Sequence, residues 1–190
     1  MLTIGVASFS QTPYNDSIRV YQKEYVNALY PVIKNDTAFI RFYRIQEAYR
    51  VHAKVAMLAS EQVFKMVTSS GISREAVRLA MVTFALDGKQ YKLYAYQLLS
   101  LKNNANTANH FFIPFIDATS NNESYAGGRY MDFELNNIQN GELVIDFNKA
   151  YNPYCAFASG YNCPIPPREN TLTVEIKAGE RYWKEKFHRE

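Results

Sequence analysis

The dipeptide Asp87-Gly88 separates two apolar stretches, and it is the sequence feature that most restricts how this chain can fold. A two-residue type I′ turn needs positive φ at both positions, and aspartate followed by glycine is a preferred pair there. The turn predicts an antiparallel hairpin of residues 77–86 and 89–99, in which Phe84 faces Tyr91. Large apolar side chains point to both faces of this hairpin, so we expect it in the middle of a sheet.

Other segments show the period-two alternation that is typical of strands. In residues 49–57, apolar side chains alternate with Arg50, His52 and Lys54, which we expect on the solvated face. Shorter candidate strands are residues 111–119, 130–138, 143–148 and 171–177. Aromatic residues make up 15% of the chain, a bias that fits sheet packing. These segments predict a mainly β fold, either an antiparallel β-barrel or a strongly bent β-sandwich.

One amphipathic helix is predicted before the strands. Asp16 or Ser17 can cap its start, and the apolar stripe from Ile18 to Leu29 follows helical spacing. We expect Pro31 to end the helix, because proline lacks the backbone N–H that a helix interior uses.

The chain has 190 residues, which predicts a single β-rich domain over residues 11–190. Residues 1–10 differ in character. They are apolar or small, and Ser8-Phe9-Ser10 has the small-x-small pattern that precedes a secretory cleavage site, although a basic segment is missing. We expect the remnant of a signal peptide there and a periplasmic or secreted protein. An ordinary terminus of a cytoplasmic protein is the alternative.

Charge and composition exclude several classes of partner. The net charge is only +3, and the sequence has no basic helix or aromatic RNA-reading motif, so we expect no nucleic-acid partner. No apolar run reaches the roughly 18 residues of a transmembrane helix. The sequence indicates no particular cofactor and no oligomeric state.

Two cysteines, Cys155 and Cys163, leave three states open. They can form a disulfide in an oxidising compartment, remain free structural thiols, or serve catalysis or metal binding. We predict no metal site, because zinc would need a second cysteine pair or a closely spaced histidine pair.

The dipeptide Asn140-Gly141 predicts a second two-residue hairpin turn, and its register places Leu135 opposite Asp146. Arg129 then lies on an apolar face, where a buried arginine needs polar partners. Asp146 and Asn148 can supply them in this register. A loop one residue longer would move Asp146 off that face.

A turn at residues 121–122 is expected to bring Asp117 back towards Arg129. The candidate ligand-binding residues are Arg129, Asp146, Asn148, Asp117, Glu123, Tyr151, Asn152, Glu169 and Asn170. We expect them to bind a small polar or anionic molecule in an aromatic-lined barrel pocket.

Two other functions fit the same residues. In a hydrolase-like enzyme, two of the carboxylates Asp117, Glu123, Asp146 and Glu169 would perform acid and base catalysis, with Arg129 stabilising negative charge. In a structural envelope module without a ligand, Arg129 would only tie the barrel closed.

Three sequence blocks carry a resemblance to a known family: residues 127–130 (GGRY), 146–156 (DFNKAYNPYCA) and 163–170 (CPIPPREN). They resemble the signature blocks of a bacterial and archaeal domain of unknown function, numbered sixteen eighty-four, and the resemblance extends from about Tyr21 to Glu180. The family has no established activity, so the resemblance implies only which positions deserve examination. Members of its Bacteroidetes-like branch often begin with an export signal, which residues 2–10 resemble.

Overall fold

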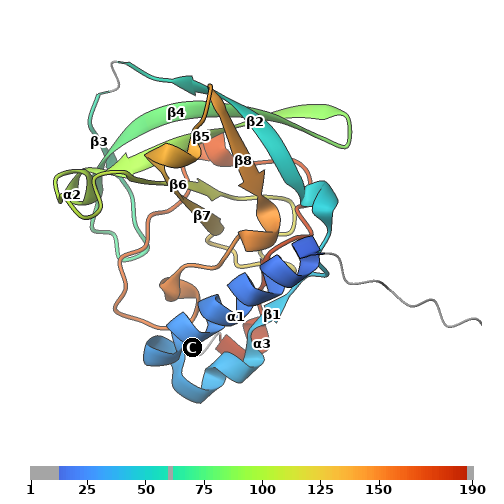
Figure 1. Cartoon of the computed structure of the whole chain (residues 1–190). Helices are drawn as coiled ribbons and strands as arrows, with labels where there is room; N and C mark the ends of the chain where they lie inside the picture. Colours follow the sequence, from blue (N-terminus) through green and yellow to red (C-terminus); the bar gives the residue numbers. More distant parts are fainter. Residues whose placement is uncertain (1–12, 60–61, 188–190) are drawn as a thin grey trace, which may run out of the picture.

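A strongly curled antiparallel sheet forms the body of the molecule, in agreement with the mainly β fold predicted from the sequence (Figure 1). The computed structural model describes residues 13–59 and 62–187, so the expected signal-peptide remnant lies outside the described residues. Within these ranges seven strands form a half-barrel in the order β7-β6-β5-β4-β2-β8, with β3 paired to β4. They are β2 (Arg50–Met57), β3 (Phe64–Met66), β4 (Arg74–Leu86), β5 (Lys89–Leu98), β6 (His110–Phe115), β7 (Arg129–Glu134) and β8 (Glu142–Asp146). A separate short pair joins β1 (Arg41–Phe42) to β9 (Glu180–Arg181).

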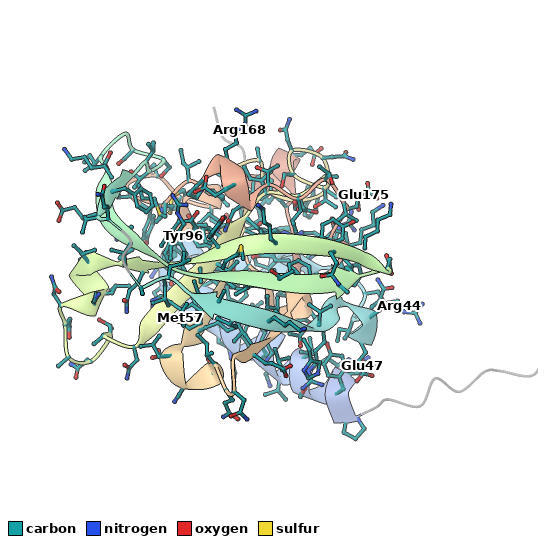
Figure 2. The ribbon with its side chains drawn as sticks, turned by 90° about the horizontal axis from the view of Figure 1, so that it is seen from above. Arg44, Glu47, Met57, Tyr96, Arg168 and Glu175 are labelled. Carbon is teal, nitrogen blue, oxygen red and sulfur yellow. A yellow bond between two sulfur atoms is a disulfide. The ribbon has the colours of Figure 1, made fainter. Side chains whose placement is uncertain are left out.

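The hairpin β4-β5 lies in the middle of the sheet, as predicted. Asp87 and Gly88 have φ values of 49° and 74°, and Phe84 faces Tyr91. The view from above in Figure 2 shows β4 and β5 crossing the molecule beside β2. On β2, His52 is exposed, as its place in the alternation predicts.

Helix α1 (Pro13–Ile33) lies below the sheet and buries Ile18 and Leu29 (Figure 1). The prediction that Pro31 ends this helix is wrong by two residues. Proline so close to the end removes only the hydrogen bond to the carbonyl of Asn27, and the helix ends where Lys34 adopts a left-handed φ of 51°. The shorter helical elements are η1 (Lys34–Phe39), η2 (Glu47–Tyr49), α2 (Leu99–Lys102), η3 (Leu135–Asn137), η4 (Phe147–Lys149), η5 (Tyr154–Ala156), η6 (Arg168–Asn170) and α3 (Lys184–Phe187). No helix among the described residues is long and apolar enough to cross a bilayer.

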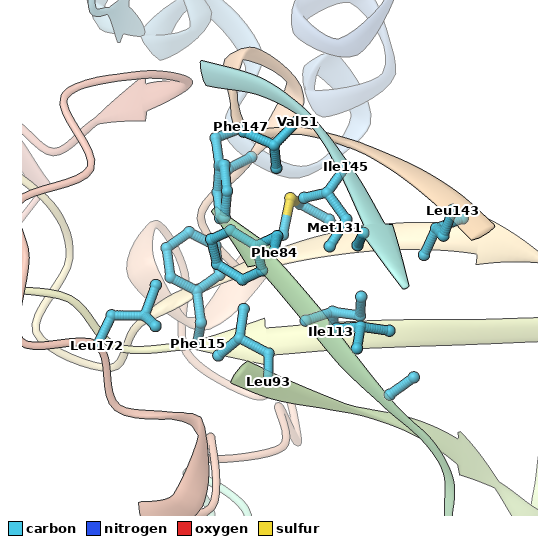
Figure 3. Close-up of a cluster of buried hydrophobic side chains, with 14 of the residues drawn as sticks. Val51, Phe84, Leu93, Ile113, Phe115, Met131, Leu143, Ile145, Phe147 and Leu172 are labelled. Atoms are coloured by element: carbon cyan, nitrogen blue, oxygen red, sulfur yellow. The ribbon is translucent and has the colours of Figure 1, made fainter. Parts of the chain in front are cut away.

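Aliphatic and aromatic side chains pack together in the core of the half-barrel (Figure 3). The ring of Phe147 lies 5.5 Å from that of Phe84 and 5.4 Å from that of Phe115, and all three side chains are fully buried. This corrects the expectation of an aromatic-lined barrel pocket, because the aromatic side chains pack against one another in the space a ligand would need.

Residues 171–177 do not form the predicted strand. They bury Leu172 and Ile176 as the alternation suggests, but their backbone bonds to the loop at residues 116–118 and to side chains. Thr171 makes a parallel bridge to Ile116, while the N–H of Ile176 donates to the Asp117 carboxylate at 2.7 Å. Side chains therefore satisfy groups that a strand partner would otherwise satisfy.

Candidate functional site

The hairpin that turns at Asn140-Gly141 is closed at both of its ends. Asn140 and Gly141 have φ values of 53° and 75°, and Gln139 bridges to Glu142 beside the turn. At the far end, Tyr130 bridges to Tyr151 through N–H···O bonds of 2.9 and 3.0 Å. Both bridges belong to the one register that the sequence predicts from a two-residue turn.

Between these bridges the two strands separate. β7 pairs with β6, whereas β8 pairs with β2, where Ile145 faces Val51. The predicted pairing of Leu135 with Asp146 is therefore wrong. The physical reason is the core: Ile145 and Phe147 are fully buried, and β2 offers β8 a complete ladder. The turns η3 and η4 then divert the two strands of the hairpin from each other.

A slot of about 660 Å³ opens in the middle of this hairpin. Its polar lining consists of the carboxylates of Asp132, Glu142 and Asp146, the basic groups of Arg50, His52 and Lys149, and the amides of Asn136, Asn137, Gln139 and Asn140. We refer to this feature as the slot.

Main-chain groups of both strands also point into the slot. Val55 donates to the carbonyl of Gly141 at 2.8 Å, and alternate residues of an antiparallel strand direct their N–H and C=O to opposite edges. The main-chain groups of Val144 therefore face away from β2 and towards β7. On β7, the N–H and C=O of Tyr130 point away from β6, because both bond to Tyr151. Asp132 lies two residues further along the strand, so its main-chain groups point the same way and face the slot.

Asp146 and Asn148 bind the first turn of α1. The Tyr14 hydroxyl lies 3.1 Å from both Asp146 carboxylate oxygens and accepts from Asn148 Nδ2 at 2.9 Å. Asn148 also exchanges hydrogen bonds of 3.0 and 2.8 Å with the main chain of Gln46. These two predicted residues lie together as expected, but they face Tyr14 and Gln46, and Arg129 is not among their partners.

Asp132 is a slot residue that the sequence analysis missed. Its carboxylate accepts from the Tyr151 hydroxyl and lies 3.1 Å from His110 Nε2. The hydrogen bond that His110 makes to the Asp132 carboxylate raises the pKa of His110, against the opposing effect of burial. The alternation of Met131 and Phe133 marks Asp132 as outward-facing, but no local pattern connects it to His110, which lies on the neighbouring strand.

Arg129 is fully buried and does not line the slot. Its guanidinium lies 3.1 Å from Asp117 Oδ1 and donates to the carbonyls of Ile176 and Ala178 at 2.8 and 2.5 Å. The turn at residues 121–122 brings Asp117 to Arg129 as predicted. These partners stabilise the irregular segment before β9 against the open side of the core.

Glu123 and Asn152 hold the same C-terminal segment. Glu123 forms ion pairs of 3.4 Å with Lys177 and 3.7 Å with Arg181. The N–H of Asn152 donates to the carboxylate of Glu180 at 2.7 Å.

Glu169 and Asn170 hold η6 against β5. Glu169 accepts from the Tyr96 hydroxyl at 3.0 Å, and Asn170 bonds both main-chain groups of Tyr94 at 2.8 Å. The nine candidate ligand-binding residues therefore lie in several separate clusters.

A buried carboxyl group, Glu180, was also missed by the sequence analysis. It is fully buried and accepts a 2.7 Å hydrogen bond from Tyr25 on α1. Burial raises its pKa from the ordinary value of 4.5 to about 8. Its sequence neighbours, Gly179 and Arg181, give no indication that the side chain of Glu180 is buried.

Cys155 and Cys163 are joined by a disulfide with their Cα atoms 6.3 Å apart. No group of three or more potential metal ligands occurs in the part of the chain that the structure describes.

Comparisons with known proteins give a family and a similar fold. A family model described as "Protein of unknown function (DUF1684)" matches residues 36–181. Among solved structures, the solution NMR structure of an uncharacterized protein of Haloarcula marismortui is similar, with 27% sequence identity and a TM-score of 0.67. The match covers 88% of this chain and 94% of that chain. No match was found among curated proteins.

Proposed function

Because the chain belongs to the DUF1684 family of proteins of unknown function, its function must be argued from its own residues, and we propose that it binds a small polar molecule with an anionic group in the slot. The observation that carries this proposal is the separation of two strands that share one register at both ends of their hairpin. The separation leaves main-chain groups of both strands facing a polar hollow.

The chemistry of the slot favours a hydroxylated anion such as a sugar acid. Arg50 and Lys149 provide positive charge for a carboxylate or phosphate. The carboxylates of Asp132 and Asp146 accept hydrogen bonds, and amide side chains both donate and accept them. A sugar acid has hydroxyls and one anionic group, so it can satisfy both sets of partners.

The first test is a native mass spectrum of protein purified without refolding, which would show a retained ligand as excess mass. Titrations with glucuronate, glucose and inorganic phosphate, followed by amide chemical shifts, then locate the binding. We expect glucuronate to shift amides of β7 and β8 and to bind more tightly than glucose.

Two variants of one strand provide a matched comparison. Arg50→Gln should weaken glucuronate binding by about fivefold or more, since it removes one close opposite charge. Lys54→Gln removes the same charge from an exposed position on the same face of β2 outside the slot, and it should leave binding unchanged. Equal effects of the two variants, or no excess mass together with no saturable shift for any of the three probes, would contradict the proposal.

The hydrolase-like alternative has less support. The four carboxylates named for it have separate partners: Asp117 binds Arg129, Asp146 binds Tyr14, Glu123 binds two basic side chains, and Glu169 binds Tyr96. We further propose a periplasmic or secreted location, which the disulfide supports because such bonds persist in oxidising compartments.

A further inference from the structure

A second hollow, of about 860 Å³, lies beside the C-terminal end of α1 and shares no lining residue with the slot. Its walls come from four segments: residues 32–36, 121–126, 155–159 and 182–187. Figure 1 shows the end of α1 and α3 together at the lower end of the molecule. We refer to this feature as the aromatic hollow.

Two pairs of aromatic rings form part of its wall. Tyr125 and Tyr182 meet edge to face with their centroids 5.1 Å apart, and Phe157 and Phe187 do the same at 5.0 Å. Burial raises the pKa of Tyr182 to about 12, so its phenol is neutral at physiological pH. The rings therefore present uncharged faces and edges, which suit contact with another aromatic ring.

Two basic side chains line the hollow, and among the described residues only one of them forms an ion pair. Lys186 forms a 3.0 Å ion pair with Asp36. Lys34 lines the same hollow, and its ammonium contacts the ring of Tyr30 at 5.8 Å. Within the described part of the chain no carboxylate forms an ion pair with Lys34. The rim of the hollow thus favours an anion.

A disulfide stabilises one wall of the hollow before any ligand arrives. Cys155 lines the hollow and is bonded to Cys163, whose carbonyl accepts from the N–H of Ser69 at 2.9 Å. The disulfide and this hydrogen bond together connect the wall segment to the turn between β3 and β4. Because this wall is already ordered, ligand binding loses less conformational entropy than it would with a flexible wall.

We propose that the aromatic hollow is a second binding site, for a flat aromatic molecule with a single anionic group. The aromatic body contacts the four rings, and the anionic group lies near the ammonium of Lys34. The volume is in the range typical of sites for small organic molecules.

The test uses two fluorescent probes that differ in one charged group: anilinonaphthalene sulfonate and its neutral analogue phenylnaphthylamine. We expect saturable binding of one sulfonate probe per chain and weaker binding of the neutral probe. Lys34→Gln should reduce the affinity for the sulfonate by about fivefold or more and leave the neutral probe unaffected. Non-saturable uptake, or equal losses for both probes, would overturn the proposal.

Three further variants locate the binding. Lys23→Gln removes the same charge from an exposed position of α1 outside the hollow, and it should change neither affinity. Ala126→Trp places a large ring in the hollow and should abolish binding of both probes. Arg50→Gln, in the slot, should change neither affinity. If it lowers the affinity for the sulfonate probe while Lys34→Gln does not, the probe binds in the slot and the aromatic hollow is not a site.

Discussion

The guanidinium of Arg129 and the carboxylate of Asp117 lie 3.1 Å apart, and neither side chain is exposed to solvent. The same guanidinium does not line the slot, and its Nη1 and Nη2 groups also donate to the carbonyls of Ala178 and Ile176. The buried arginine thus stabilises the irregular segment before β9 by binding its carbonyls. This arrangement accounts for an arginine on a face that is otherwise apolar.

Removing either member of this pair should strongly destabilise the protein. We expect Arg129→Met or Asp117→Asn to lower the free energy of unfolding by about 3–5 kcal/mol, because each leaves a buried group without its partner. Urea denaturation monitored by circular dichroism measures this loss. In the double variant the losses should be clearly less than additive. An Arg129→Met protein as stable as wild type would refute this structural role.

Stability should fall as the pH rises from about 4.5 to about 8, because of Glu180. The pKa of this carboxyl is raised to about 8 in the folded protein, so the folded state keeps a proton that the unfolded chain releases near pH 4.5. Its contribution is complete below pH 4.5 and is lost by pH 8. The slope is about 1.4 kcal/mol per pH unit within this window.

Glu180→Gln is the matched variant, because it keeps the shape and removes the ionisation. We expect it to resemble wild type near pH 4 and to be more stable than wild type at pH 8. Melting temperatures measured across this range provide the comparison. Parallel pH profiles for the two proteins would show that Glu180 does not titrate between these limits.

A methyl group at position 179 should be poorly tolerated. Gly179 has a φ of 76°, and a Cβ there would lie 2.5 Å from the Ala150 carbonyl oxygen and 2.6 Å from that of Phe147. Gly179→Ala should therefore destabilise by about 3 kcal/mol or more. Gly88→Ala is the control, since Gly88 has a similar φ of 74° with no atom within 4 Å of that position. It should cost only about 1–2 kcal/mol, and equal losses would show that the close approach at Gly179 has no effect.

The disulfide should be present in protein isolated under non-reducing conditions. The denatured chain should then be about 2 Da lighter than the reduced chain, because oxidation of two thiols removes two hydrogens. Replacing both Cys155 and Cys163 by serine should lower stability by about 2–3 kcal/mol. A fully reduced mass would instead indicate free thiols and would remove the support for a periplasmic or secreted location.

Local sequence determined those elements whose partners lie close by in the chain. Asp87-Gly88 fixes the register of β4 and β5 because the turn conformation itself aligns the two strands. The same reasoning at Asn140-Gly141 gave the correct register at both ends of the second hairpin. Asp117 was also placed near Arg129 correctly, since only a short turn separates them.

Tertiary structure decided that the two strands of the second hairpin separate between its two ends. The pairing of β8 with β2 and the burial of Phe147 outweigh the local preference for a continuous hairpin, and so the slot forms. Tyr14 and Tyr25, which donate to Asp146 and Glu180, lie on α1, more than 130 positions away in sequence. Register and turn chemistry act over a few residues, whereas packing a core selects among distant segments. For that reason the sequence alone determined the strands and their turns, and only the folded chain decided which polar side chains face a hollow and which hold the structure together.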